Sequence, residues 1–506
     1  MSGFAVAYGD GDPRRIERAF ETIAHRGPYL TGTSTWGRTT MAQNYLRADT
    51  GQASPDAIVP VSGAVDPNFR ICCDTQMGNW NELAGSNDVS DGPFREERLL
   101  LELYRKHGKE MLRYLDDAIF AFVISKGDEI FAARDLLGIK TLFYGRKGDT
   151  LYLASELKAL AAVADEIHEF PTGHYMDGSG EFVRFAELPK VPPAPLQADV
   201  DEMVKGVREI IERSVRNRVD FTVPTASLLS GGMDSSVIAY LASEICREKF
   251  GRGARLKTYA LGVGESGDIT NARIMAEHIN SEHHELIVDL DELLDVLPET
   301  IYHLESFDPS LVRSSVSNYL ISRYARNQGI EVLLSGEGGD EIFCGYTYLK
   351  SFPPEELFSR QMECIGLLHN NASLRLDRMN HCHSIRVVAP LISGELFQYT
   401  LAVPSEYKQK PEGDRKVEKW IFRKAYEPFL PEAITWRIKQ EFSQGSGSAA
   451  MLPGYFEKTV GDKEFKEAQA IHPVIRSKEE FYYFKIFADR FGYDHAVKTV
   501  GQWICL

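Results

Sequence analysis

At Leu228-Leu229-Ser230-Gly231-Gly232-Met233-Asp234-Ser235-Ser236, an apolar run ends in a glycine-rich turn and a helical pattern begins. Residues 223–229 predict a buried strand, and residues 235–242 predict a helix. The two glycines let backbone N–H groups converge on one point, and a helix N-terminus adds partial positive charge there. Three serine hydroxyls add donors, and Asp234 can hold the Mg²⁺ that accompanies phosphates. Ser-Gly-Gly alone would also suit an ordinary corner between a strand and a helix, but the full stretch predicts a phosphate site.

The sequence around this stretch alternates between strand and helix patterns. Strands are expected at residues 256–263, 284–288 and 329–335, and helices at 203–218, 272–279, 290–305 and 314–327. Such a βαβ rhythm predicts a parallel sheet that binds ligands at the carboxyl ends of its strands. The last ~150 residues are typical of helices, so residues 201–506 predict one α/β domain with a helical C-terminal part.

The first ~185 residues have a different pattern, rich in short strands. Strands are expected at residues 4–8, 69–73, 119–125, 129–133, 141–145 and 151–155, with helices at 14–25 and 94–106. Prolines at 189, 192, 193 and 195 disfavour both helix and sheet. The predicted organisation is therefore a domain at 1–188, a linker at 189–200 and a second domain at 201–506.

Composition limits the classes of partner. Of the 506 residues, 43% are hydrophobic and 26% charged, which is typical of a soluble globular protein. The net charge of −16 argues against nucleic acid or an anionic membrane as the partner. No apolar run approaches the ~20 residues that span a bilayer, and no signal-peptide pattern opens the chain. The seven cysteines form no CxxC pair, so we expect a reducing, cytoplasmic setting.

Two further segments carry groups suited to catalysis. Residues 332–334 lead into Ser335-Gly336-Glu337-Gly338-Gly339-Asp340-Glu341, a second glycine-rich turn at a strand end. Asp340 could bind a second Mg²⁺, and Glu337 could act as a general base or orient an amine. Lys439 precedes a Gly/Ser-rich loop and could stabilise charge on a phosphate or a tetrahedral intermediate. The alternatives are a solvated acidic turn and an ordinary surface lysine.

Together these segments resemble class B asparagine synthetases and their relatives, the β-lactam synthetases and lasso-peptide cyclases. The matching segments are His25-Arg26-Gly27-Pro28, residues 133–140 (with Thr141 in place of a Pro), residues 154–160, SGGMDSS, SGEGGDEIF and KQEFSQGSG. They extend over nearly the whole chain.

The resemblance implies an α+β N-terminal domain, an Ntn-type glutaminase-like β-sandwich, followed by an α/β parallel-sheet ATP-pyrophosphatase domain. It implies ATP and Mg²⁺ as cofactors, a small-molecule carboxylate and ammonia or an amine as reactants, and a homodimer. The resemblance also implies roles for single residues. It implies Mg²⁺ ligands at Asp234 and Asp340, catalytic roles for Glu337 and Lys439, and substrate contacts at Leu311 and Arg313. The implied nucleotide and pyrophosphate contacts are Leu229, Ser230, Gly231, Gly232, Asp234, Ser235, Ser236, Leu261, Ser335 and Gly336.

The N-terminal domain departs from the family where glutamine would react. Ser2 stands where the family has its nucleophilic Cys, and a hydroxyl is deprotonated far less easily than a thiol. Residues 74–79 replace an NGEIYN-like segment, Tyr45 falls near an expected Arg, and Glu96 falls near an expected Asp. We therefore expect a glutaminase-like domain without glutaminase activity.

The second domain departs only around the acyl substrate. Leu311 replaces a hydroxyl residue of the TTxR segment, and Arg386 and Val388 replace an acid and an Arg. The second change would reset the charges that the pocket or its wall can satisfy, or would only repack the scaffold. Three functions remain open: an AMP-forming amide ligase that uses ammonia, a relative that uses another amine within one molecule or from a second substrate, and a non-catalytic nucleotide-binding protein. Glu337 stands where β-lactam synthetases have a Tyr, which favours amide formation between two molecules.

Overall fold

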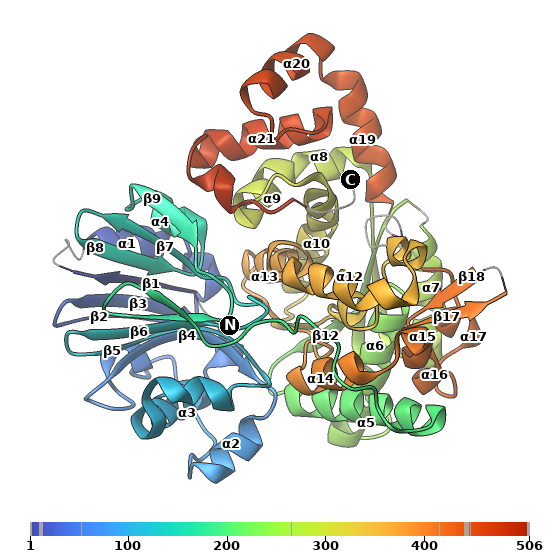
Figure 1. Cartoon of the computed structure of the whole chain (residues 1–506), viewed down its shortest axis with the longest axis horizontal. Helices are drawn as coiled ribbons and strands as arrows, with labels where there is room; N and C mark the ends of the chain where they lie inside the picture. Colours follow the sequence, from blue (N-terminus) through green and yellow to red (C-terminus); the bar gives the residue numbers. More distant parts are fainter. Residues whose placement is uncertain are drawn as a thin grey trace. The chain divides into compact units, whose positions relative to one another are not determined.

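The computed structural model describes residues 3–9, 14–51, 53–264, 266–413, 415–439, 445 and 447–502 (Figure 1). The chain forms two compact units. The first comprises residues up to Leu188 together with 380–386 and 488–501, and the second comprises residues 189–379 and 387–487. Ser2 lies outside the described residues, so the structure says nothing of it.

The first unit contains two antiparallel sheets. One has the order β2 (Leu30–Trp36), β3 (Thr39–Tyr45), β1 (Gly3–Tyr8), β8 (Thr150–Ala154), β7 (Phe143–Lys147), β9 (Glu166–Glu169). The other has the order β11 (Phe182–Arg184), β10 (His174–Asp177), β6 (Glu129–Arg134), β5 (Ala118–Lys126), β4 (Arg70–Met77). The predicted β-sandwich is confirmed.

Alternation along β5 explains how this unit is filled. Ala121 and Val123 join a core cluster that also contains Phe4 and Leu153 of the other sheet. Phe120, Phe122 and Ile124 point to the opposite face, where they join a second cluster with leucines of α3 (Arg95–His107). Successive side chains of a strand point to opposite faces, so one strand serves both cores.

The second unit is built on a sheet of order β14 (Glu282–Val288), β13 (Lys257–Val263), β12 (Thr225–Leu228), β15 (Val332–Leu334), β16 (Arg386–Val388). The pairs β12–β13, β13–β14 and β12–β15 are parallel, as predicted. In chain order, β13 and β14 are added on one side of β12, and β15 is then added on its other side. A reversal of this kind leaves a crevice at the carboxyl ends of the two central strands.

Helices complete the second unit. The helices between these strands are α6 (Met233–Phe250), α7 (Gly267–His278), α8 (Leu290–Asp295), α9 (Leu297–Leu304) and α10 (Pro309–Asn327). The single helix expected at 290–305 is thus two, because Pro298 opens a new helix at its first turn. The helical C-terminal part is confirmed, with α12 (Pro354–Gly366), α13 (Ala372–His381), α14 (Gly394–Ala402), α16 (Trp420–Tyr426), α19 (Ser448–Thr459), α20 (Asp462–Ile471) and α21 (Lys478–Phe491).

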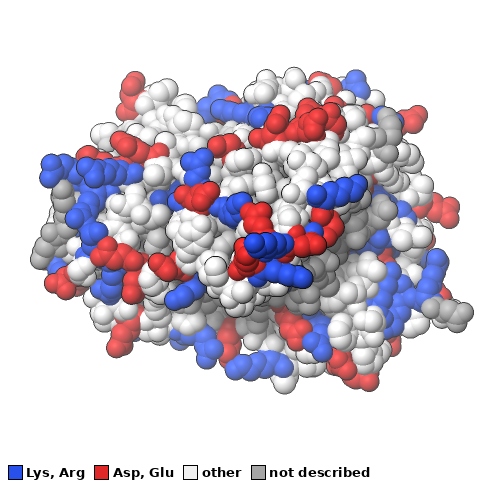
Figure 2. All heavy atoms as spheres, turned by 90° about the horizontal axis from the view of Figure 1, so that it is seen from above, with Lys and Arg blue, Asp and Glu red and all other residues white. Residues whose placement is uncertain are grey.

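The predicted linker region lies at the boundary between the two units. The units divide between Leu188 and Pro189, and α5 (Val200–Arg218) begins with a capping box formed by Asp199 and Glu202. Acidic and basic side chains are interspersed over the face shown in Figure 2. Within the described ranges, no helix combines the length and apolar character needed to cross a membrane.

Candidate functional site

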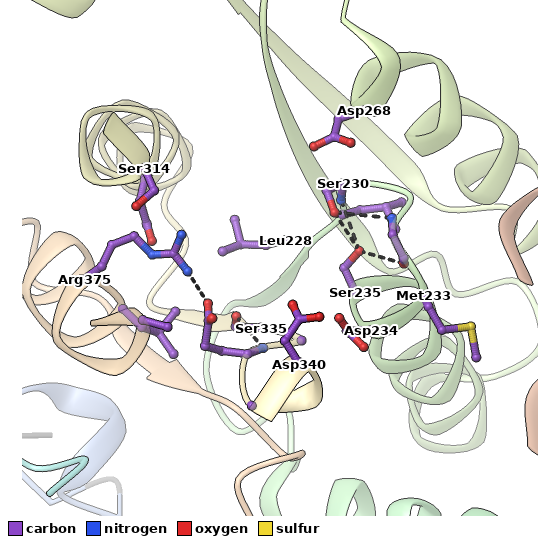
Figure 3. Close-up of a pocket in the computed structure, with 18 of the residues that line it drawn as sticks. Leu228, Ser230, Met233, Asp234, Ser235, Asp268, Ser314, Ser335, Asp340 and Arg375 are labelled. Carbon is purple, nitrogen blue, oxygen red and sulfur yellow. Dashed lines mark hydrogen bonds and ion pairs between the residues drawn. The ribbon is translucent and has the colours of Figure 1, made fainter. Parts of the chain in front are cut away.

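A cavity of about 200 Å³ lies in the second unit at the carboxyl ends of β12, β13 and β15 (Figure 3). The predicted site residues that line it are Leu229, Ser230, Gly232, Asp234, Ser235, Leu261, Ser335, Gly336, Glu337, Asp340 and Lys439. The predicted residues outside its lining are Gly231, Ser236, Leu311 and Arg313. The fold thus brings residues as far apart in sequence as Leu229 and Lys439 to one cavity.

The loop after β12 is shaped for an anion. Gly231 has φ +66°, and a Cβ there would lie 2.4 Å from the backbone of Asn271. The Ser235 hydroxyl accepts a hydrogen bond from the Ser230 N–H at 3.3 Å and lies 3.1 Å from the Ser230 hydroxyl. Gly232 caps α6, and no side chain that the structure describes caps this helix. The first N–H groups of α6 can therefore serve a phosphate.

The two glycine-rich loops touch. A Cβ on Gly336 would lie 2.5 Å from the backbone N of Ser235, and a Cβ on Gly339 would lie 2.4 Å from Oδ1 of Asp234. Real Cβ atoms essentially never approach so closely. Position 336 therefore requires glycine so that the second loop can lie against the start of α6, whereas a side chain at position 339 would displace the carboxylate of Asp234.

Figure 3 shows the carboxylates of Asp234 and Asp340 lying close together. The Nζ atom of Lys419, at the start of α16, lies 2.5 Å from Oδ2 of Asp234 and 2.6 Å from Oδ1 of Asp340. Lys439 Nζ lies 2.7 Å from Oδ2 of Asp340. Burial by itself raises the pKa of Asp340, but the charges of Lys419 and Lys439 outweigh burial and hold the pKa well below its usual range.

The same carboxylates fit a divalent cation. Asp234 Oδ1 is buried and accepts no hydrogen bond from any residue that the structure describes. A buried oxygen without a partner is costly unless an ion or water binds it, and carboxylate oxygens are the ligands that Mg²⁺ prefers. No group of three His, Cys, Asp or Glu in the described part of the chain could hold a metal ion. A cation here would therefore take its remaining ligands from phosphate and water.

Sequence reasoning missed Asp268 and Arg437. Arg437 lies 3.1 Å from Oδ1 of Asp268 and donates to the carbonyl of Gly231 at 2.9 Å. Burial raises the pKa of Asp268, which the charge of Arg437 partly opposes. This pair holds the carbonyl of Gly231 in the first glycine-rich loop. Both residues lie outside the recognised glycine-rich motifs, and only the tertiary contacts single them out.

Sequence reasoning also missed Arg375, which lies on α13 and forms an ion pair with Glu337. Figure 3 shows Arg375 reaching from its helix toward the loop that carries Ser335. At the same end, α10 presents Ser310, Ser314 and Asn318 to the cavity. The end of the cavity remote from α6 therefore carries hydroxyl and amide groups and the ion pair of Arg375 with Glu337.

The two predicted substrate contacts lie elsewhere. Leu311 is buried, and the Arg313 guanidinium donates to Glu479 at 3.0 Å. Glu479 is held in turn by the Tyr483 hydroxyl at 2.8 Å. Neither Leu311 nor Arg313 is among the described residues that line the cavity.

Arg386 was expected to change the charge of the pocket wall. Instead it belongs to the first unit, where it donates to the Ala48 carbonyl at 3.0 Å and lies 3.6 Å from Asp49. Val388, its companion, uses its carbonyl to accept a hydrogen bond from Ser335 N at 2.9 Å. Arg386 is not among the described residues that line the cavity, so its contacts agree with the alternative that this segment only packs the scaffold.

In the first unit, the segment that replaces NGEIYN begins with a buried charge network. Arg26 lies 3.0 Å from Asp74 and 2.8 Å from Glu156, and Lys140 lies 2.8 Å from the other oxygen of Asp74. Lys158 also pairs with Glu156. All five side chains are at most 2% exposed. Asp74 is thus an ionised acceptor fixed by two cations.

Tyr45 and Glu96 are the other two positions of the first unit where the chain departs from the family pattern. Tyr45 is fully buried, and its ring meets that of Phe94 edge-on with the centroids 5.3 Å apart. Glu96 accepts a hydrogen bond from Met77 N at 3.4 Å. Tyr45 therefore fills space between apolar groups instead of offering a cation.

Comparison with known proteins agrees with these two units. The glutamine amidotransferase domain family matches residues 1–213, and the asparagine synthase family matches residues 206–363 and 353–484. The probable asparagine synthetase (glutamine-hydrolyzing) of Schizosaccharomyces pombe is 32% identical, covering 95% of this chain and 91% of its own. Asparagine synthetase (glutamine-hydrolyzing) 1 of Saccharomyces cerevisiae is 31% identical, covering 100% and 96%. The chain therefore belongs to the asparagine synthetase family.

Proposed function

We propose that the protein is an ATP-dependent amide ligase that forms AMP and pyrophosphate. It adenylates a carboxylate and transfers ammonia, or another amine, to the activated acyl group. One observation carries this proposal: two glycine-rich loops meet in one cavity, and their carboxylates Asp234 and Asp340 lie there with Lys439. Family membership supports the same activity.

The first step uses the phosphate loop. A carboxylate oxygen of the substrate attacks the α-phosphorus of ATP, and the bond from that phosphorus to the leaving pyrophosphate breaks. The N-terminus of α6 and the hydroxyls of Ser230 and Ser235 would bind pyrophosphate. Asp234 and Asp340 would hold Mg²⁺, which would offset the charge of the phosphates. Leu229, Leu261, Ser335 and Gly336 remain the proposed frame for adenosine.

The second step uses the opposite end of the cavity. The amine nitrogen attacks the acyl carbon, the bond from that carbon to the AMP oxygen breaks, and AMP leaves. Glu337, held by Arg375, is the proposed acceptor of the proton that the nitrogen loses. Lys439 is the proposed cation that stabilises the tetrahedral intermediate. Leu311 and Arg313 would act on the substrate only through the packing of α10, since they are outside the lining.

The nitrogen would come from free ammonia or an amine, because we propose that the first unit does not hydrolyse glutamine. An oxyanion needs hydrogen-bond donors, whereas Asp74 places a fixed negative charge in the segment that replaces NGEIYN. Ser2 in place of a nucleophilic Cys points the same way. The expected result is that glutamine yields no glutamate coupled to ATP use.

Two alternatives differ in chemistry. Glu337 in place of the Tyr of β-lactam synthetases favours amide formation between two molecules over closure of a ring. A non-catalytic nucleotide-binding protein would not need Asp234, Asp340 and Lys439 to converge. We further propose a cytoplasmic homodimer that acts on small molecules and binds neither nucleic acid nor membrane.

The test is a pyrophosphate-release screen. Carboxylates, with aspartate among them, are each offered with ATP, Mg²⁺ and either ammonia, glutamine or small amines. We expect at least one carboxylate to elicit pyrophosphate together with AMP, and ammonia to raise the yield of amide. A broad screen in which no carboxylate elicits pyrophosphate contradicts the proposal.

A further inference from the structure

Lys419 is almost fully buried, with 1% of its side chain exposed, and its ammonium bridges Asp234 and Asp340. Room for it is made by Gly345, where a Cβ would lie 1.9 Å from Cε of Lys419 and 2.2 Å from Oδ1 of Asp340. Lys419 itself starts α16 with φ +55°, a left-handed conformation that is uncommon for a residue with a side chain. The missing Cβ of Gly345 and the left-handed backbone of Lys419 therefore together position the ammonium group of Lys419.

The charges of this cluster balance without a metal ion. Asp234 and Asp340 contribute two negative charges, and Lys419 and Lys439 contribute two positive charges. A divalent cation that entered alone would leave a net charge of about +2 in a partly buried space, which is unfavourable at the low effective dielectric there. A triphosphate that entered with the cation would bring the opposing negative charge.

We propose that Lys419 is a positioning residue that holds Asp234 and Asp340 together and makes binding of a divalent cation depend on the nucleotide. Its ammonium occupies the space between the two carboxylates until metal and triphosphate arrive together. The inference rests on the proposed function, because it takes these two carboxylates as the metal ligands. It goes further by assigning an order: little metal binds before the nucleotide.

The experiment measures Mn²⁺ binding to the full-length protein by electron paramagnetic resonance, with and without a non-hydrolysable ATP analogue. For the wild type we expect the analogue to tighten Mn²⁺ binding at least tenfold. Lys419→Met and Lys419→Gln remove the charge, and each should tighten Mn²⁺ binding without the analogue at least tenfold. The dependence on the analogue should shrink accordingly.

Lys408→Met is the matched control. Lys408 is 2% exposed and donates to Oε1 of Gln361 at 3.0 Å, so its loss also removes a buried ammonium from the same unit. It should leave Mn²⁺ binding unchanged, whereas a general effect of losing a buried lysine would appear in it too. Circular dichroism confirms that each variant is folded, and the Gln variant serves if the Met variant is not.

The role of Lys419 and the assignment of the metal ligands fail in different ways. If folded Lys419 variants bind Mn²⁺ without the analogue no more tightly than the wild type, the role of Lys419 is overturned. If neither wild type nor variants bind Mn²⁺ even with the analogue, the assignment of Asp234 and Asp340 as metal ligands fails, and the inference fails with it.

Discussion

The Nζ atom of Lys439 lies 2.7 Å from Oδ2 of Asp340, although 99 positions separate the two residues. The contact joins the C-terminal part of the chain to the second glycine-rich loop. It places the amine of a lysine at the cavity lining, beside a carboxylate proposed as a metal ligand. Lys439, which the sequence offered as a catalytic candidate, thus lines the candidate active site.

Lys439→Met should lower carboxylate- and ammonia-dependent amide formation by about 10²–10³-fold, because it removes the positive charge proposed to stabilise the tetrahedral intermediate. Steady-state assays of the amide product give the change. Lys463→Met, at a side chain that is 89% exposed, is the matched control and should retain full rate. Equal rates for the two variants would refute the role of Lys439.

Asp234→Ala should abolish pyrophosphate release, because the substitution removes a proposed metal ligand at the start of α6. The exposed Asp201, in α5, provides the control variant Asp201→Ala, which should behave as the wild type. Turnover retained by Asp234→Ala would show that the metal is held elsewhere.

Gly336→Ala should separate the two glycine-rich loops, because the new Cβ would meet the backbone N of Ser235 at 2.5 Å. We expect weaker ATP binding, by at least tenfold in calorimetry, with the fold retained. A Cβ on Gly454, in α19, would meet nothing within 4 Å, so Gly454→Ala should bind ATP normally. Unchanged ATP affinity in Gly336→Ala would contradict the requirement for close approach.

Asp74→Ala should destabilise the protein by roughly 3–5 kcal/mol, because it leaves the buried Arg26 and Lys140 with one counter-ion fewer. Urea unfolding measures the difference. The exposed pair of Asp165 and Lys147 gives the comparison, and Asp165→Ala should cost roughly 0–1 kcal/mol. Similar costs for the two variants would argue against a structural role of the buried network.

Glu97 should make stability depend on pH. Burial raises the pKa of Glu97 from 4.5 to about 7 in the folded protein. Between these values the unfolded chain ionises Glu97 while the folded protein keeps it protonated, so the free energy of unfolding falls as pH rises. The stability that protonated Glu97 contributes is therefore complete below pH 4.5 and is lost as pH rises through about 7. Relative to the wild type, Glu97→Gln should gain roughly 3 kcal/mol between pH 4.5 and 7.5. Urea midpoints measured across that range check it, and a difference that stays constant with pH would count against it.

The fold could largely be predicted from sequence. Strands such as β1 and β5 and helices such as α3 and α5 follow from local periodicity, which a single segment carries by itself. The strands β2 and β3 escaped prediction. They contain many threonines and few large apolar residues, so their pairing along seven positions, from Leu30–Tyr45 to Trp36–Thr39, is decided by partner strands.

The sequence by itself determined the two glycine-rich loops and the carboxylates they carry, because a strand end, glycines and a helix start lie together in the chain. Only the tertiary structure decided which cations face them. Lys419, Arg375 and Arg437 come from separate helices and loops, and no local pattern marks them. The same holds for Arg313 and Arg386, whose motif positions suggested the substrate but whose charges are met by Glu479 and Asp49. Ion pairs between distant segments depend on how whole elements pack, and that information lies in no single stretch of sequence.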